Sequence, residues 1–331
     1  MVPADSGRKL AASDLVFLGV TRPLRYFEPG SPVEVTTRTL HGRLLLRPGA
    51  ALTDIIHGVL GRAQALYGLH IHAYVFLSNH YHLLCSPTDP QQLARFMCFL
   101  NSNVAREAGR LYAWKEKFWS RRYQAIPVSG EPAAQIGRLK YLLAHGVKEG
   151  FVSTPSHWPG AHCVDALLQG KPLHGLWFDR SAEYEARRRG IEVSSRDFAS
   201  EQTVVLTPLP CWQHSSEAEV RTRIADLVRD IERDARRLQR ATGREPLGAD
   251  AVQRQNPHQE PARLKRSPAP LVHAASKRAR RAFLDAYRIF VSAYRRAAER
   301  LRCGDLSASF PEYSFPPPLP FARGPAIATA Y

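Results

Sequence analysis

The sequence is short of cysteine, of long apolar runs and of acidic residues, and each shortage excludes a class of protein. The five cysteines are odd in number, scattered and never arranged as Cys-x-x-Cys, which argues against a disulfide framework and a thiolate zinc site and favours a reducing cytoplasm. No apolar run approaches the roughly 20 residues of a membrane-spanning helix, and residues 1–12 lack the apolar core of a secretory signal. We therefore expect a cytoplasmic protein with no membrane partner.

Basic residues greatly outnumber acidic ones. The 331 residues include 46 Lys and Arg against 30 Asp and Glu, which gives a formal net charge of +16. Most of the basic residues are arginine, whose guanidinium group suits bidentate contacts with phosphate. This charge favours a polyanionic partner, with nucleic acid ahead of an anionic membrane.

Between residues 33 and 148 the apolar pattern predicts an ordered set of strands and helices. We expect a strand, a helix, two strands joined by Ser78-Asn79, a helix, a strand and a last helix. The predicted ranges are 33–39, 51–67, 71–77, 81–85, 91–106, 123–128 and 132–148. All but the last helix form the split β-α-β pair of a ferredoxin-like α+β fold, a four-stranded antiparallel sheet with helices on one face. The last helix is an addition to that fold.

The pattern changes after about residue 155. Loops around a short helix are expected first, then a helix at 217–242, a loose connector at 244–271, a helix at 276–302 and a proline-rich tail at 315–321. We therefore divide the chain into an irregular segment 1–21, a domain 22–160 that contains the sheet, and a basic, mostly helical region 161–331 that ends in the tail.

His82 lies in the predicted strand 81–85, and His80 directly precedes that strand. Residues i and i+2 of a strand point to the same face, so two imidazoles there make half of a metal site. The pair alone is weak evidence, because exposed or hydrogen-bonded histidines are common. His70 and His72 have the same spacing.

Tyr141 lies opposite the apolar stripe of the predicted helix 132–148, with His145 one turn further on and Lys148 nearby. One helical face thus offers a hydroxyl nucleophile, a nitrogen ligand and a cation. Such a set suits attack on a phosphodiester whose oxygens are polarised by a metal. Packing of the aromatic ring against the C-terminal region is the alternative explanation.

Four segments together resemble the HUH nucleases, and among them the REP-associated tyrosine transposases, a single-tyrosine group related to short insertion-sequence transposases. Asn79, His80 and His82 resemble the family's Asn-His-hydrophobic-His signature. Residues 119–128 are similar to its Trp-Gln-x-x-Tyr/Phe segment, residues 141–152 to its tyrosine helix, and residues 26–38 to its first strand. The resemblance covers residues 22–160, which we expect to be the catalytic domain.

The resemblance implies a ferredoxin-like fold, a divalent metal ion (Mg or Mn) and single-stranded DNA with a REP-like hairpin as substrate. It selects His80 and His82 as metal ligands and Tyr141 as the nucleophile that forms a 5′-phosphotyrosine. His145 stands where the family has Asn or Gln as third ligand, and Gly146 where it has Pro. Imidazole is also a competent ligand, one that shifts preference towards softer ions such as Mn.

Arg121, Arg122, Lys140 and Lys148 flank these motifs and are the expected phosphate contacts, although each could simply be solvated. The basic helix 276–302 could grip a DNA stem, pack on the catalytic domain, or do both. A non-catalytic RNA-recognition module, a replication initiator or relaxase, and a decayed transposase copy are the competing interpretations. Monomer and homodimer both remain open.

Overall fold

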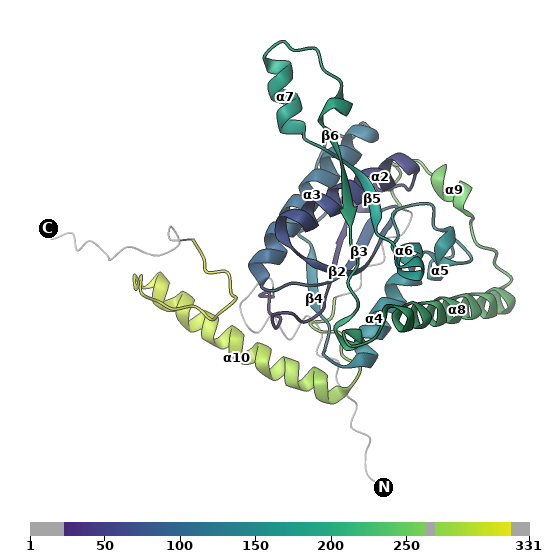
Figure 1. Cartoon of the computed structure of the whole chain (residues 1–331). Helices are drawn as coiled ribbons and strands as arrows, with labels where there is room; N and C mark the ends of the chain where they lie inside the picture. Colours follow the sequence, from purple (N-terminus) through teal and green to yellow (C-terminus); the bar gives the residue numbers. More distant parts are fainter. Residues whose placement is uncertain (1–22, 262–268, 319–331) are drawn as a thin grey trace, which may run out of the picture.

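A four-stranded antiparallel sheet forms the centre of the protein, which is seen in a computed structural model that describes residues 23–261 and 269–318 (Figure 1). The strand order is β2-β3-β1-β4. The strands are β1 (Val33–Arg38), β2 (His70–Leu77), β3 (His80–Ser86) and β4 (Gln124–Pro127). The predicted α+β class and the ferredoxin-like sheet are confirmed. The predicted irregular segment 1–21 lies outside the described residues.

Helices cover the two faces of the sheet unequally. On one side lie α2 (Ala50–Tyr67) and α3 (Pro90–Leu111), and on the other α4 (Pro132–Leu143) and α5 (His145–Lys148). Alternation along β3 separates the two sides, because successive strand residues point to opposite faces. The Tyr81 hydroxyl donates a hydrogen bond to Asn101 of α3 at 2.6 Å. The rings on either side of it, His80 and His82, therefore face α4 and α5.

The predicted helix 132–148 is two consecutive helices that join at Ala144. Ala144 N donates to Lys140 O at 2.9 Å, and Lys148 N donates to Ala144 O at 2.7 Å. The backbone therefore keeps a helical course through the joint, and Tyr141 and His145 stay one turn apart on the same side.

A two-stranded antiparallel pair, β5 (Leu173–Phe178) and β6 (Ala199–Val204), lies on the outer side of α2. The sequence pattern predicts only loops and helices in this part of the chain. Glycines make this contact possible. A Cβ atom at Gly58 would lie 2.1 Å from the Leu176 carbonyl, and one at Gly175 would lie 2.2 Å from Asp54 O. The backbones of α2 and β5 thus touch directly.

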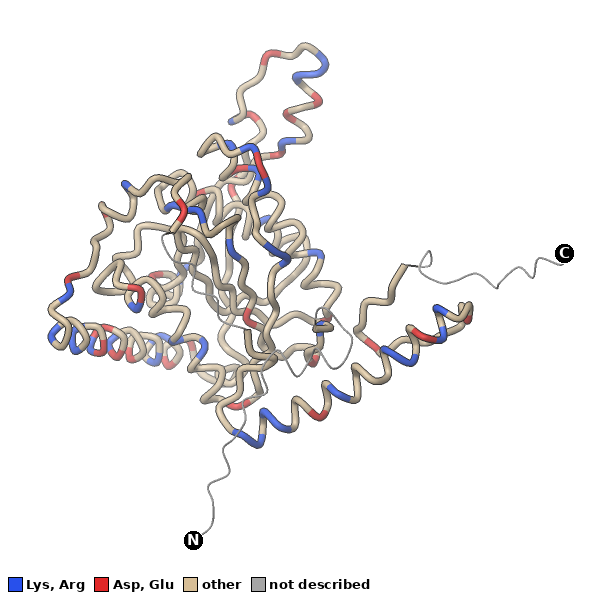
Figure 2. The backbone as a smooth tube through the Cα atoms, turned by 180° about the vertical axis from the view of Figure 1, so that it is seen from behind, with Lys and Arg blue, Asp and Glu red and all other residues tan. Residues whose placement is uncertain are grey.

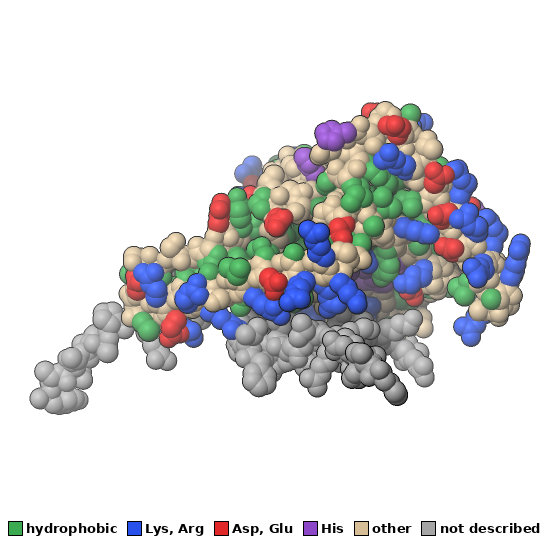
Figure 3. Space-filling view, turned by 90° about the horizontal axis from the view of Figure 1, so that it is seen from below, with side chains coloured by type: hydrophobic (Ala, Val, Ile, Leu, Met, Phe, Trp, Pro, Cys, Tyr) green, Lys and Arg blue, Asp and Glu red, His purple; other side chains and the backbone are tan. Residues whose placement is uncertain are grey.

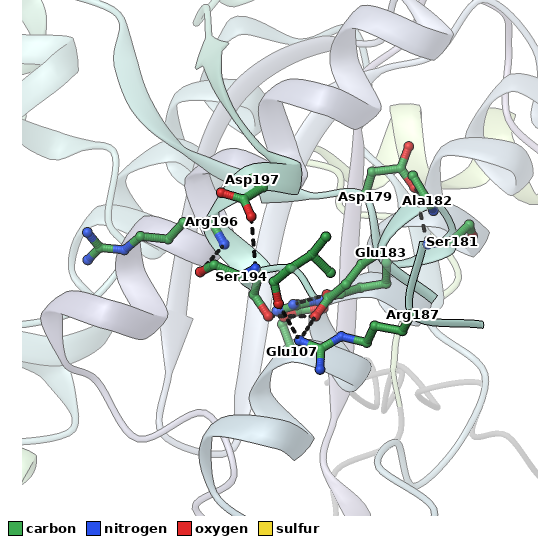
Figure 4. Close-up of polar contacts among 12 residues, drawn as sticks. Glu107, Asp179, Ser181, Ala182, Glu183, Arg187, Ser194, Arg196 and Asp197 are labelled. Carbon is green, nitrogen blue, oxygen red and sulfur yellow. Dashed lines mark hydrogen bonds and ion pairs between the residues drawn. The ribbon is translucent and has the colours of Figure 1, made fainter. Parts of the chain in front are cut away.

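The segment between β5 and β6 projects from the body and carries α7 (Arg180–Arg188) (Figure 1). Arg180 anchors it to α3, donating from Nε to Glu107 Oε1 at 2.8 Å. Glu183 accepts hydrogen bonds from Arg187 at 2.9 Å and from Ser195 at 2.7 Å (Figure 4). Buried carboxylates at the base therefore hold the projecting segment in place.

The region after residue 160 is mainly helical, as predicted. It contains α6 (Val164–Gln169), α7, α8 (Glu217–Thr242), α9 (Ala249–Gln253) and α10 (Lys277–Arg302). The connector predicted to be loose contains α9 and is tied to the body, for example by Leu247 N, which donates to Gly150 O at 2.9 Å. Residues 262–268 of that connector, and the tail beyond residue 318, lie outside the described residues.

Segments of this region pair with both edges of the sheet. Phe76 N of β2 donates to Ala161 O at 2.9 Å, and Thr207 N donates to Ile71 O at 2.7 Å. At the other edge, His273 N donates to Pro127 O of β4 at 2.8 Å. An exposed strand edge can pair with another chain. The C-terminal region covers part of both edges with these hydrogen bonds and so protects the sheet from such pairing.

Charge is distributed differently on the two long helices. Acidic and basic residues alternate along α8, whereas α10 is mostly basic (Figure 2). Neither these nor the other helices within 23–261 and 269–318 combine the length and apolar character of a membrane span.

Candidate active site

Three histidines converge on the face of the sheet that α4 and α5 cover. His80 and His82 come from β3, and His145 begins α5. One nitrogen of each ring lies within 4.8 Å of the others, so the three could hold one metal ion. His80 Nε2 and His145 Nε2 are 3.0 Å apart, and the ring centres of His82 and His145 are 4.5 Å apart.

Hydrogen bonds orient the two strand histidines. His80 Nδ1 lies 2.6 Å from Asn79 Oδ1, and His82 Nδ1 lies 2.8 Å from Glu34 Oε1. The Asn79 amide is itself oriented, because its Nδ2 donates to Gly42 O at 3.0 Å. Each Nδ1 therefore donates its hydrogen to an oxygen, which leaves the Nε2 lone pair for a metal.

The donor set fits a divalent ion. Two nitrogen ligands about 2.1 Å from an ion and at right angles lie about 3 Å apart, which is the separation of His80 Nε2 and His145 Nε2. Burial, followed by the nearby His82, lowers the pKa of His80 well below its usual value and that of His145 to about 2. Both imidazoles are therefore neutral, the form that binds metals.

Glu34 is a buried carboxylate at the centre of the site. It lies in β1 with 1% of its surface exposed, and besides His82 it contacts Arg138 Nη2 and His273 Nε2, each 2.6 Å from Oε2. Burial alone would raise its pKa, but hydrogen bonds from His273 and His82 and the positive charge of Arg138 hold the pKa well below its usual range. Glu34 is therefore ionised and fixes the groups around it.

Tyr141 of α4 lies against the histidines. Its ring centre is 5.6 Å from that of His82 and 5.0 Å from that of His145. The guanidinium carbon of Arg138 and Lys148 Nζ lie 4.0 and 4.5 Å from the Tyr141 ring centre. Burial and then the charge of Glu34 raise the pKa of Tyr141, an effect that Arg138 opposes. The phenol is therefore protonated at neutral pH.

The expected phosphate contacts fall in different places. Lys148 lies beside Tyr141. Lys140 forms ion pairs with α8 instead, its Nζ 3.2 Å from Asp234 Oδ2 and 3.8 Å from Asp230 Oδ2. Arg121 and Arg122 have exposed side chains in the loop before β4. Binding of phosphate by any of them stays a prediction.

His70 and His72 do not form a comparable site. A β-bulge interrupts the register between Ile71 and Ala73. The His72 ring is buried, with Nδ1 2.9 Å from Thr207 O and Nε2 2.8 Å from Ser86 Oγ. Both of its nitrogens are thus occupied, while His70 is exposed.

Sequence reasoning missed Glu34, Arg138 and His273. An acidic residue inside an otherwise apolar and β-branched strand was a usable signal for Glu34. Arg138 precedes Tyr141 by three residues, a spacing that puts both on one side of a helix. Nothing near His273 in the sequence indicates its position, because only the pairing with β4 brings it to the site.

Low pH should destabilise the metal-free protein through its buried histidines. Burial lowers the pKa of His72 and His162 to about 4 and that of His145 to about 2. Between pH 7 and 5.5 the unfolded chain takes up protons on these residues and the folded chain does not. The free energy of unfolding should therefore fall by about 1 kcal/mol for each of them.

Urea unfolding at the two pH values measures this loss. In His145→Asn the loss should shrink by about 1 kcal/mol, whereas the carboxylate Glu34 adds nothing in this pH window because its pKa is already lower. A free energy of unfolding that does not change between pH 7 and 5.5 would contradict the neutral state of these rings.

One known protein family is similar to the part of the chain that carries most of this site. The sequence model of the family described as "Transposase IS200 like" matches residues 49–141, a segment that contains His80, His82 and Tyr141. No curated protein matches the chain.

Two solved structures are similar to part of the chain. A REP-associated tyrosine transposase bound to a REP hairpin is 15% identical, with 45% of this chain and 86% of that chain covered and a TM-score of 0.37. A provisionally named transposase from Deinococcus radiodurans R1 is 19% identical, with 36% and 95% covered and a TM-score of 0.27. The family match confirms the resemblance drawn from the sequence motifs, because residues 49–141 of this chain are similar to the IS200-like transposases.

Proposed function

We propose that this protein is a metal-dependent transposase that cleaves and rejoins single-stranded DNA through a phosphotyrosine. One observation carries the proposal: Tyr141 lies against two of three histidines whose nitrogens lie close enough to hold one ion. The family match gives the same reaction class. A protein that only binds nucleic acid needs neither the buried histidine cluster nor a tyrosine beside it.

In the proposed reaction the Tyr141 hydroxyl attacks a DNA phosphorus. The bond from phosphorus to the 3′ oxygen breaks, the phenol loses its proton and the leaving oxygen gains one, so that a 5′-phosphotyrosine and a 3′-hydroxyl result. A second 3′-hydroxyl then attacks the phosphotyrosine and restores both a phosphodiester and the phenol, with no need for ATP. A divalent ion held by His80, His82 and His145 would act as a Lewis acid towards the non-bridging oxygens.

Two cations beside Tyr141 are suited to help this attack. Arg138 and Lys148 lie over the phenol ring, where positive charge stabilises the phenolate as it develops and attracts the phosphate. Arg138 is already held by Glu34, so we assign it to orienting the helix and Lys148 to contacting the phosphate. The all-nitrogen ligand set favours Mn over Mg.

We infer that α10 binds the stem of a DNA hairpin. Basic side chains gather on the underside of the molecule, where α10 lies (Figure 3). The first turns of α10 carry the exposed Lys277, Arg278, Arg280 and Arg281 and no acidic residue. Cations near a helix N-terminus oppose the helix dipole, and a phosphate backbone would relieve that repulsion.

The apolar side of α10 has a separate role. Tyr287, Phe290 and Val291 are buried and pack with Leu24, Tyr26, Leu271 and Phe283. Packing and charge therefore occupy different sides of the helix, and both can act together. A deletion of the C-terminal region would also uncover the sheet edges, so substitutions test its DNA binding more cleanly.

Tyr141→Phe should abolish the covalent adduct that forms when the protein is incubated with a labelled single-stranded hairpin and Mn, because the nucleophilic oxygen is gone. The adduct is measured by denaturing electrophoresis, and hairpin affinity by fluorescence anisotropy should not change. Tyr123→Phe is the matched control and should form the adduct as the unaltered protein does. Adduct formation by Tyr141→Phe would place the nucleophile elsewhere.

Replacing Arg278, Arg280 and Arg281 together with Gln should weaken hairpin binding and flatten its salt dependence. Removing one side chain that neutralises a phosphate lowers the slope of log affinity against log salt by about 0.7 to 0.9. The matched control replaces Arg229, Arg233 and Arg236 of α8, which removes the same charge from residues that already pair with acidic neighbours. Equal effects of the two triple changes would assign binding to overall charge instead of α10.

A further inference from the structure

We propose that His273, far along the chain from the other site residues, is a positioning residue for the metal-binding His82 and acts through Glu34. The inference rests on the proposed function, because it concerns the ion that the three histidines would hold. It makes the C-terminal region a structural part of the active site.

Backbone pairing fixes the position of His273. His273 N donates to Pro127 O, and Ser129 N donates to His273 O, each at 2.8 Å. The neighbouring Val272 is buried. The segment thus lies beside β4 as a short parallel bridge, and the His273 ring reaches across towards β1 with Nε2 2.6 Å from Glu34 Oε2.

Glu34 links His273 to the metal site, because its carboxylate contacts both His273 and His82. Its Oε1 lies 2.8 Å from His82 Nδ1 and accepts a hydrogen bond from Arg138 Nη2 at 2.7 Å, while Arg138 Nη2 and His273 Nε2 each lie 2.6 Å from Oε2. A buried carboxylate that loses one partner turns towards its remaining partners or takes in water, since an unpaired buried charge is costly. Either change would disturb the hydrogen bond that sets the tautomer and orientation of His82.

Glu131 holds the other end of the same segment. Its Oε2 accepts hydrogen bonds from Ala275 N at 2.9 Å and Ser276 N at 3.3 Å. Glu131 directly precedes α4, which carries Tyr141, and Ser276 caps the start of α10. Residues 272–276, which we name the strap, therefore join the basic helix to the nucleophile helix and the metal site.

Two amide substitutions test the role of His273 directly. In His273→Gln the side-chain nitrogen can occupy the place of Nε2, whereas in His273→Asn it reaches only as far as Nδ1. Both variants place a neutral polar side chain at the strap. We expect His273→Gln to bind Mn²⁺ nearly as the unaltered protein does and His273→Asn to bind it about tenfold more weakly, a loss at the lower end of that seen when the hydrogen-bond partner of a metal-ligating histidine, here Glu34, is disturbed.

The measurements are Mn²⁺ affinity by calorimetry and the visible absorption of bound Co²⁺, both on the full chain without DNA. Metal-free hairpin affinity and the melting temperature control for folding. His214→Ala controls for loss of a histidine, because His214 is exposed and its Nε2 lies 3.0 Å from Gln213 Nε2, away from the residues of the site. Equal Mn²⁺ affinities and identical Co²⁺ spectra for the Gln and Asn variants would overturn the role of His273. Failure of the unaltered protein to bind either ion would overturn the proposed function as well.

Discussion

The buried carboxylate of Glu34 is the interaction on which the rest of the site depends. An ionised group inside a sheet costs several kcal/mol unless its charge and lone pairs are matched. Its partners come from β3, from α4 and from the strap, namely His82, Arg138 and His273. Because one carboxylate needs all of them, it fixes three distant parts of the chain relative to the central strand β1.

The same contacts orient the residues that we propose to be catalytic. Arg138 and Tyr141 are three residues apart on α4. The hydrogen bond from Arg138 to Glu34 therefore helps to fix the position of α4 relative to β1, and with it the distance between the Tyr141 ring and the histidines. Asn79 orients His80 as Glu34 orients His82. Two strand histidines thus present their Nε2 atoms before any ion arrives, which reduces the reorganisation that binding requires.

The sequence predicted the sheet well because alternation and helical periodicity are strong between residues 33 and 148. It did not predict β5 and β6, because Gly175 interrupts the apolar pattern of β5 and both strands are stabilised by backbone contact with the glycines of α2. Spacing alone left His70 and His72 as an equal candidate pair, and the motif resemblance selected His80, His82, Tyr141 and His145, which the structure brings together. The contact between His273 and Glu34 depends on tertiary pairing, so no local pattern could have indicated it.

A crystal structure of the full chain grown with Mn²⁺, with the ion located by anomalous scattering, would show directly whether the three histidines hold a metal beside Tyr141. We expect one strong peak within coordination distance of the Nε2 atoms of His80, His82 and His145, with the Tyr141 hydroxyl facing it. A crystal saturated with Mn²⁺ that shows no peak there, or an ion held by other side chains, would contradict this expectation.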